Sequence, residues 1–289
     1  TIINTNDYLK YKWNIGTNSN TTLSTTPYIH FDSTDTSKLN ILPTPNHEWY
    51  FIGKTENVAD TGEDTPVKAA PHNFSSNHYT SEGYHIGGTG VDSRHINIDQ
   101  WNWGGEIAVE VYLKFDFAGG EILNWARIFG FGSGQHNKVM YLGFHGDTRS
   151  KFAFMINNST GNGGLRYEMD YDNFITPQDF NDTGNGINNW IHICLVYNDK
   201  NNSAPILYKN GQAILPSSED TSMVSRIYPE STTRTYHFIG RSLWADQYGD
   251  PNLKATIAYM RIWHGNDAIS LTQTHITTLY NNRENNIFL

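Results

Sequence analysis

The chain has 289 residues, of which 37% are hydrophobic and 17% are charged, and its formal net charge is −9. No basic stripe or Arg-rich segment accompanies that negative balance, so nucleic acid is excluded as an expected partner. No run approaches the roughly 20 apolar residues that a membrane-spanning helix requires, so membrane insertion is not expected.

Residues 1–44 carry the weakest pattern of the chain. Two short apolar pieces, Tyr8–Ile15 and Tyr28–Phe31, flank a Thr/Ser/Asn-rich stretch and are read as strands on an extension. Pro43 and Pro45 then mark a boundary. We therefore expect residues 1–44 to be an N-terminal extension or extra strands, followed by one domain over residues 45–289.

The beginning of this domain combines a short strand with a long polar segment. Trp49–Ile52 reads as a strand, because aromatic and β-branched residues favour extended structure. Thr55–Ser81 is polar and contains Pro66 and Pro71, so we expect a loop that runs over the surface.

The clearest strand signal of the chain is Glu106–Phe115. Strict alternation over ten residues predicts a strand with one buried face and one solvated face. The predicted buried face holds Ile107, Val109, Val111, Leu113 and Phe115, and the other holds Ala108, Glu110, Tyr112 and Lys114.

Further strands are expected at short intervals after it. They are Arg127–Phe131, Val139–Phe144, Phe152–Ile156, Arg166–Tyr171, Trp190–Tyr197, Tyr236–Gly240 and Thr256–Trp263. Trp190–Tyr197 is apolar on both faces, which favours a central strand, and it contains the single cysteine, Cys194, which is expected to be a buried thiol. Ile206–Lys209 and Gln212–Leu215 flank Asn210-Gly211, a pair that predicts a type I′ hairpin turn.

One helix is expected near the C-terminus. Ser270 can cap it, and Ile276, Leu279 and Tyr280 share one helical face. Many short strands with a single helix predict an all-β fold, either a sandwich or a barrel, and not an α/β fold.

Several stretches resemble, in the same order, the laminin-G-like members of the concanavalin A-like lectin/glucanase superfamily. The resemblance runs from about His47 to Arg283, about four-fifths of the chain. Its most specific pieces are Trp190-Ile-His-Ile-Cys-Leu-Val-Tyr, Leu207-Tyr-Lys-Asn-Gly, Ile239-Gly-Arg-Ser-Leu-Trp and Ile257-Ala-Tyr-Met-Arg-Ile-Trp. These resemble the family patterns W-x-H-I-A-x-V-Y, L-Y-V-N-G, I-G-R-S-x-W and I-D-D-V-R-I-Y. The resemblance implies a two-sheet antiparallel β-sandwich of jelly-roll type with one short C-terminal helix. It does not imply the function, because this fold hosts lectins, adhesion modules, glycosidases, lyases and structural domains.

Sugar binding requires aromatic faces beside hydrogen-bonding side chains. Three clusters fit that description. The first is Trp244 with Arg241, Asp246 and Gln247; the second is Trp101, Asn102 and Trp103; and the third is Trp125 with Arg127.

Calcium is the one candidate cofactor, and the competing interpretation of its candidate ligands is ordinary Asp turn chemistry. Its candidate ligands are Asp92, Asp246 and Asp250, since Ca²⁺ prefers several converging oxygens. Ala258-Tyr259 stands where many relatives carry Asp residues, a departure from the family's calcium pattern.

A catalytic alternative rests on Glu168, Asp170 and Asp172. Alternate residues of a strand lie about 7 Å apart on one face, within the range of glycosidase carboxylate pairs. The run resembles the E-x-D-x-E of laminarinase-like enzymes, with Asp172 in place of the acid Glu. The competing interpretation is an ordinary polar strand face.

The function predicted first is a non-catalytic carbohydrate-binding or adhesion module, part of a larger surface or virion protein. Its partner would be an oligosaccharide or a glycoprotein glycan, and its location extracellular or surface-exposed. A glycoside hydrolase or polysaccharide lyase is the second interpretation. A structural or homo-oligomerising domain without a ligand is the third.

Overall fold

The computed structural model divides into two compact units, Thr1–Leu39 and Asn40–Leu289. The residues that the structure describes are 42–54, 56–62, 68–71, 78–87, 93–116, 124–146, 151–161, 165–176, 179, 190–221 and 224–284. The strands predicted at Tyr8–Ile15 and Tyr28–Phe31 lie outside them.

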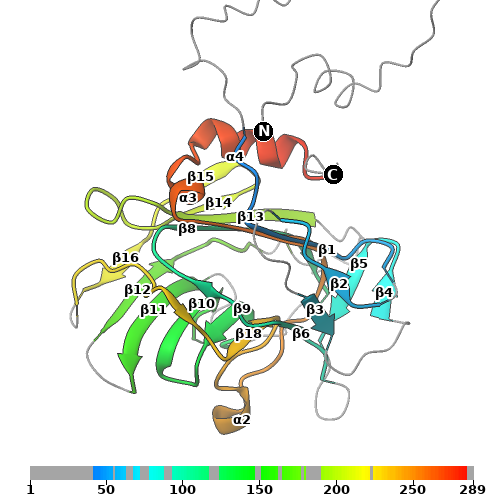
Figure 1. Ribbon diagram of the computed structural model, residues 1–289, viewed down its shortest axis with the longest axis horizontal. Helices are drawn as coiled ribbons and strands as arrows, with labels where there is room; N and C mark the ends of the chain where they lie inside the picture. The colour runs from blue at the N-terminus through cyan, green and yellow to red at the C-terminus, as the bar shows by residue number, and fades with distance from the viewer. Residues whose placement is uncertain are drawn as a thin grey trace, which may run out of the picture. The chain divides into compact units, whose positions relative to one another are not determined.

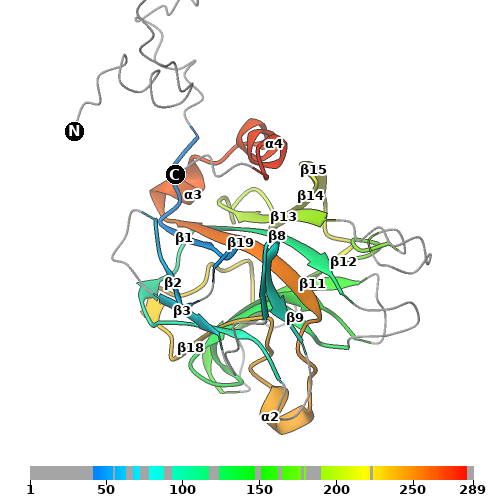
Figure 2. The same cartoon turned by 90° about the vertical axis from the view of Figure 1, so that its right-hand side faces the viewer.

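Two antiparallel sheets stack face to face in the second unit (Figures 1 and 2). Sheet A has the order β15-β14-β13-β8-β19-β5-β4, with β1 also paired to β19. Its strands are β1 (His47–Tyr50), β4 (Tyr79–Thr80), β5 (Gly83–Ile86), β8 (Ile107–Phe115), β13 (Trp190–Tyr197), β14 (Ile206–Lys209), β15 (Gln212–Ile214) and β19 (Ala255–His264).

Sheet B has the order β16-β12-β11-β10-β9-β18-β6-β3-β2. Its strands are β2 (Val58–Ala59), β3 (Lys68–Pro71), β6 (Ile96–Ile98), β9 (Arg127–Gly132), β10 (Asn137–Phe144), β11 (Phe152–Thr160), β12 (Arg166–Tyr171), β16 (Ser218–Asp220) and β18 (Tyr236–Ile239). A small separate ribbon pairs β7 (Asn102–Trp103) with β17 (Thr232–Thr233). The predicted all-β sandwich is confirmed.

The main core fills the space between the two sheets. Alternation along each strand sends one set of side chains into it, as with Val109 and Val111 from β8 and Phe152 and Phe154 from β11. The predicted hairpin is also confirmed, because Asn210 and Gly211 both have positive φ angles, 51° and 77°.

The outer face of sheet A is covered by helices, which corrects the prediction for Glu106–Phe115. All nine residues of β8 are buried, so the strand is not half-solvated. Two helices, α3 (Asn266–Ile269) and α4 (Gln273–Asn281), lie over this face (Figure 1). They bury a second apolar cluster that includes Ala108, Cys194 and Trp263.

Helix α4 begins later than Ser270, the predicted cap. Thr272 is the N-cap: its side chain accepts a hydrogen bond from the His275 N–H at 3.4 Å. The His275 ring accepts in return from the Thr272 N–H at 3.2 Å, which completes a capping box. Ser270 instead ends α3.

The prediction of a surface loop over Thr55–Ser81 is wrong in part. Its described residues include β2, β3 and β4, and Ala69 of β3 is fully buried. Strands this short carry no readable alternation, so pairing with longer neighbours decides their structure. Among the described residues, no helix combines the length and apolar character needed to span a bilayer.

Candidate functional site

The outer face of sheet B carries the candidate sites, because helices cover the outer face of sheet A. Below sheet B, the short helix α2 (Ala245–Tyr248) projects next to β9 and β18 (Figure 1). A hollow of about 400 Å³ lies between β18 and the α2 segment, and we name it the β18–α2 hollow. Its lining residues are Gly134, Gln135, Tyr236, Phe238, Arg241, Ser242, Leu243 and Asp246.

Two aromatic rings of β18 form one wall of this hollow. Alternation turns His237 and Ile239 toward the core and leaves Tyr236 and Phe238 on the outer face. The Tyr236 and Phe238 ring centroids are 5.4 Å apart, and Tyr236 is 44% exposed. Such a pair offers an apolar surface that water reaches.

Two charged side chains also line the hollow, next to the rings. The Arg241 guanidinium lies 5.4 Å from the centroid of the Phe238 ring, and its Nη2 donates to Asp246 Oδ1 at 2.5 Å. The Asp246 side chain is 87% exposed and the Arg241 side chain 18% exposed. The hollow therefore combines an aromatic wall with a hydrogen-bonding donor and acceptor.

Glycines of β9 allow the α2 segment to approach the sheet this closely. A Cβ on Gly130 would lie 2.9 Å from the Arg241 carbonyl oxygen, and a Cβ on Gly132 would lie 2.7 Å from Leu243 Cδ1. Larger residues at either position would push the segment away, so this glycine spacing fixes the second wall of the hollow.

The first predicted sugar cluster is brought together only in part. Arg241 and Asp246 line the hollow, and Gln247 is exposed on α2. Trp244 is partly buried and turns toward the sheet, with its ring edge-on to Tyr141 and its Nε1 donating to His136 Nε2 at 3.4 Å. It supports the α2 segment, and Tyr236 and Phe238 provide the aromatic surface in its place.

The second predicted cluster is used for packing. Trp103 is 1% exposed, so it cannot offer a ring face to a ligand in solution. Trp101 stacks on His237 with ring centroids 4.0 Å apart and packs against the main core. Asn102 is exposed and accepts from Ser231 Oγ at 3.1 Å.

The third predicted cluster is divided. Arg127 is 2% exposed, donates to the Phe144 carbonyl at 2.6 Å and stacks 3.8 Å above the Tyr141 ring centroid, so it is not available to a ligand. Trp125 is partly exposed, has a φ of 63°, and places its ring edge-on to His145 at 4.8 Å.

The predicted calcium ligands do not converge among the described residues. Asp92 lies outside them. Asp246 pairs with Arg241, and Asp250 accepts from Ser242 Oγ at 2.6 Å. Neither belongs to a group of three or more metal-ligating side chains in the described part of the chain.

Glu168 and Asp170 share the outer face of β12, whereas Asp172 is exposed on the turn after the strand. His145, which follows β10, joins the two carboxylates: its Nδ1 lies 2.5 Å from Asp170 Oδ1 and its Nε2 lies 3.7 Å from Glu168 Oε1. We call His145, Glu168 and Asp170 the carboxylate–histidine cluster.

The neighbours of Asp170 favour its ionised form. Burial raises the pKa of Asp170, but the hydrogen bond from Lys151, the charge of His145 and the hydrogen bond from Ser218 outweigh burial and lower it below its usual value. A general acid needs a raised pKa. Asp170 is therefore suited to be a counter-ion or ligand, and catalysis by Glu168 and Asp170 stays a prediction.

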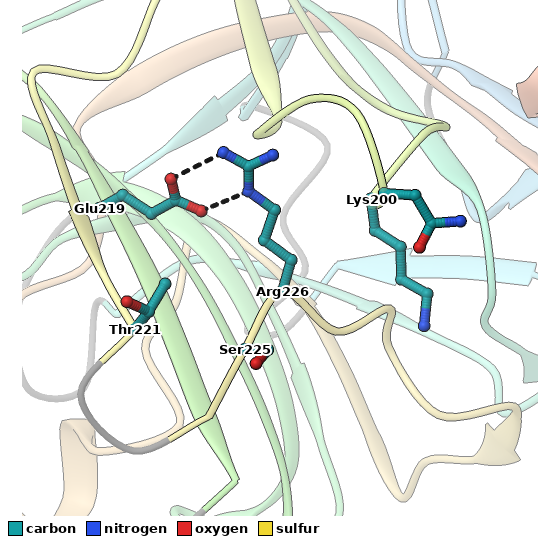
Figure 3. Close-up of a pocket in the computed structure, with 6 residues that line it drawn as sticks. Lys200, Glu219, Thr221, Ser225 and Arg226 are labelled. Carbon is teal, nitrogen blue, oxygen red and sulfur yellow. Dashed lines mark hydrogen bonds and ion pairs between the residues drawn. The ribbon is translucent and has the colours of Figure 1, made fainter.

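A second hollow, of about 470 Å³, lies at the β16 edge of sheet B (Figure 3). Arg226 donates to both carboxylate oxygens of Glu219, at 2.6 and 2.9 Å, and Lys200 stands across from them. No aromatic residue is among its lining residues, Lys200, Asn201, Glu219, Thr221, Ser225 and Arg226, so it lacks the surface that a sugar ring prefers.

Tyr236, Phe238 and His145 belong to the candidate sites but were not predicted from the sequence. The first two alternate with His237 and Ile239 in a strand that is apolar on both faces, so periodicity gave no sign of which face was open. His145 carries no local signal, because its partners lie more than 20 residues away in the sequence.

No protein-family model matches the chain. No curated protein matches it either. Solved structures with similar folds exist at low sequence identity. A Trypanosoma rangeli sialidase in complex with sialic acid aligns with a TM-score of 0.50 and 11% identity over 83% of this chain and 33% of that chain.

The HCR/D F1240A mutant aligns with a TM-score of 0.50 and 12% identity over 83% of this chain and 52% of that chain. Domain 4 of AbnA, a GH43 extracellular arabinanase from Geobacillus stearothermophilus in complex with arabinotriose, aligns with a TM-score of 0.47 and 14% identity over 82% and 98%. The chain thus spans about a third of the sialidase and about half of HCR/D. At these identities the similarity concerns the fold.

Proposed function

We propose that the chain is a non-catalytic carbohydrate-recognition module of the concanavalin A-like, laminin-G-like kind, which binds an oligosaccharide in the β18–α2 hollow. The observation that carries the proposal is that two partly or largely exposed rings, Tyr236 and Phe238, line the same hollow as Arg241 and Asp246. Pyranose rings bury their apolar faces on aromatic side chains, while charged and polar groups orient their hydroxyls.

The low charged fraction of the sequence fits a neutral, hydroxyl-rich ligand. Only 17% of residues are charged. A neutral ligand does not require a large basic face, because it has no net charge to attract. The similarly folded sialidase structure contains sialic acid, which supports a carbohydrate ligand in general terms. A glycan-binding module of this kind would act at an extracellular, cell or virion surface, where glycans are displayed.

Affinity gel electrophoresis against a polysaccharide panel, followed by a glycan array, tests the proposal. We expect retardation by at least one glycan and its loss in the Tyr236→Ala/Phe238→Ala double variant. Tyr248→Ala is the matched control, because Tyr248 is 65% exposed on α2 but is not among the residues that line the hollow. No binding to any glycan, or equal loss in the control, would reject the proposal.

Calcium remains a prediction attached to this function. Repeating the glycan assay with added Ca²⁺ and then with EDTA tests it directly. Binding that persists unchanged in EDTA removes calcium from the recognition mechanism and leaves the hollow itself as the site.

A further inference from the structure

We propose that the carboxylate–histidine cluster is a binding site for a divalent first-row transition metal ion such as Zn²⁺ or Mn²⁺. His145, Glu168 and Asp170 each offer one ligand atom, and these atoms all lie within 4.8 Å of one another. No other group of three or more such ligands is found in the described ranges.

The sheet brings the three ligands together across an intervening strand. Glu168 and Asp170 are two residues apart on β12, whereas His145 follows β10, and β11 lies between those strands. Along the row, Asp170 pairs with Ala153 and Ala153 pairs with Gly143. Because Ala153 and Gly143 are small, the His145 ring and the Asp170 carboxylate can meet above β11, with 2.5 Å between Nδ1 and Oδ1.

Neighbouring groups hold the ligands in fixed orientations. The Tyr141 hydroxyl donates to Glu168 Oε1 at 3.1 Å, and Ser218 Oγ donates to Asp170 Oδ2 at 2.9 Å. The Trp125 ring packs edge-on against His145. Hydrogen bonds and packing of this kind around the ligands orient them and contribute to metal affinity.

Besides His145, two cationic side chains form ion pairs with the carboxylates of the cluster. Lys151 Nζ lies 2.8 Å from Asp170 Oδ2, and Arg166 forms an ion pair with Glu168. Their side chains are 31% and 44% exposed, whereas those of Glu168 and Asp170 are 5% and 14% exposed. Both long cationic side chains can therefore swing into water while the ligands stay in place. Arg127, also nearby, is held by its hydrogen bond to the Phe144 carbonyl.

The donor set selects the class of ion. One imidazole nitrogen with two carboxylate oxygens suits Zn²⁺, Mn²⁺ and similar ions, whereas Ca²⁺ takes 6–8 oxygen ligands. The site therefore differs from the calcium expectation in both its residues and its metal.

Isothermal titration of the full chain with ZnCl₂, and separately with MnCl₂, tests the proposal without any glycan. We expect one ion per chain from at least one of the two salts, with affinity lowered at least tenfold in His145→Ala and in Asp170→Asn. Lys151→Ala should bind more tightly than the wild type, because it removes the competing cation.

His85→Ala is the matched control, because His85 Nδ1 lies 2.9 Å from Asp116 Oδ2 without a third ligand. It should bind as the wild type does, and thermal melts should show that every variant is folded. The proposal is overturned if neither the wild type nor Lys151→Ala binds either ion. It is equally overturned if folded His145→Ala retains the wild-type affinity.

Discussion

Replacing Arg261 by Met should destabilise the sandwich far more than removing an exposed arginine. Arg261 is fully buried on the outer face of sheet A. Its Nε donates to Glu48 Oε1 at 2.6 Å, and its Nη1 donates to Glu110 Oε2 at 3.1 Å. His192 Nε2 and the Tyr259 hydroxyl contact the other carboxylate oxygen, Glu110 Oε1, at 2.9 and 3.0 Å.

The pKa of Glu110 gives the size of the effect. Burial raises this pKa, but the charge of Arg261, together with the hydrogen bond and charge of His192, outweighs burial and lowers it from 4.5 to about 2. A shift of that size corresponds to about 3 kcal/mol of favourable interaction with the ionised carboxylate. Removing Arg261 also leaves Glu48 without its cation, so we expect a loss of roughly 3–5 kcal/mol in the free energy of unfolding.

Urea denaturation followed by tryptophan fluorescence measures this loss. Arg226→Met is the matched control, because the Arg226–Glu219 pair is bidentate but its side chains are 32% and 25% exposed. Exposed pairs contribute about 0–1 kcal/mol. Adding Glu110→Gln to Arg261→Met should restore part of the loss. Equal destabilisation by Arg261→Met and Arg226→Met would refute the reasoning.

Three further changes give measurable outcomes. Gly132→Val should cost roughly 1–3 kcal/mol and weaken glycan binding, because a side chain there displaces Leu243; unchanged affinity on a glycan array would contradict this. Thr272→Ala should lower the unfolding free energy by about 1 kcal/mol in urea, since it removes the α4 cap; a cost near zero would mean that the cap is dispensable. Burial, with Arg234 and His47, holds the pKa of His237 well below 6.5, so only the unfolded chain takes up this proton as pH falls. Stability measured by urea titration should therefore decrease below about pH 6.5, and His237→Asn should flatten that slope; an unchanged slope would assign it to other groups.

Glu110 predicts a second, lower pH window. Its folded pKa is below its unfolded value, so its stabilising contribution is present above about pH 4.5 and is lost as pH falls toward 2. In Arg261→Met this contribution should shrink, because only His192 then opposes the rise in the Glu110 pKa that burial causes. Urea titrations of both proteins between pH 5 and 3 measure the difference. Parallel pH profiles would show that Arg261 is not the cause of the lowered pKa.

Alternation predicted the long strands because their side chains have a strict period of two. Arg166–Tyr171 and Trp190–Tyr197 have the same bounds in the structure as in the prediction. Alternation did not predict the solvent exposure of β8 correctly. Glu110 and Lys114 suggested a solvent-exposed face, but both are buried by elements far away in the sequence. A period reveals which residues share a face and not what covers that face.

The candidate sites depended on the same missing information. Trp103 and Trp244 were natural candidates as platforms, since isolated tryptophans near polar residues look like ligand contacts. The neighbouring strands determine how far these two tryptophans are buried. Trp103 lies in the core, and the Trp244 ring packs edge-on against Tyr141 of β10. The open aromatic face came from Tyr236 and Phe238, whose exposure follows from the position of β18 next to the small residues of β9.

The coverage of the two sheets explains where ligands can bind. The C-terminal helices cover an apolar cluster on the outer face of sheet A, and the ion pair between Arg261 and Glu110 on the same sheet is buried. Within the described part of the chain, the helix next to the outer face of sheet B is the four-residue α2, and Tyr236 and Phe238 line the hollow beside it. Shortening the segment from Arg241 to Asp250 to a tight turn would therefore test whether this segment is needed for glycan binding and whether the metal site is independent of it. We expect glycan affinity to fall because a wall of the hollow is lost, while the carboxylate–histidine cluster on β10 and β12 keeps its metal affinity. Loss of both activities in a folded variant would mean that the two sites are coupled through α2.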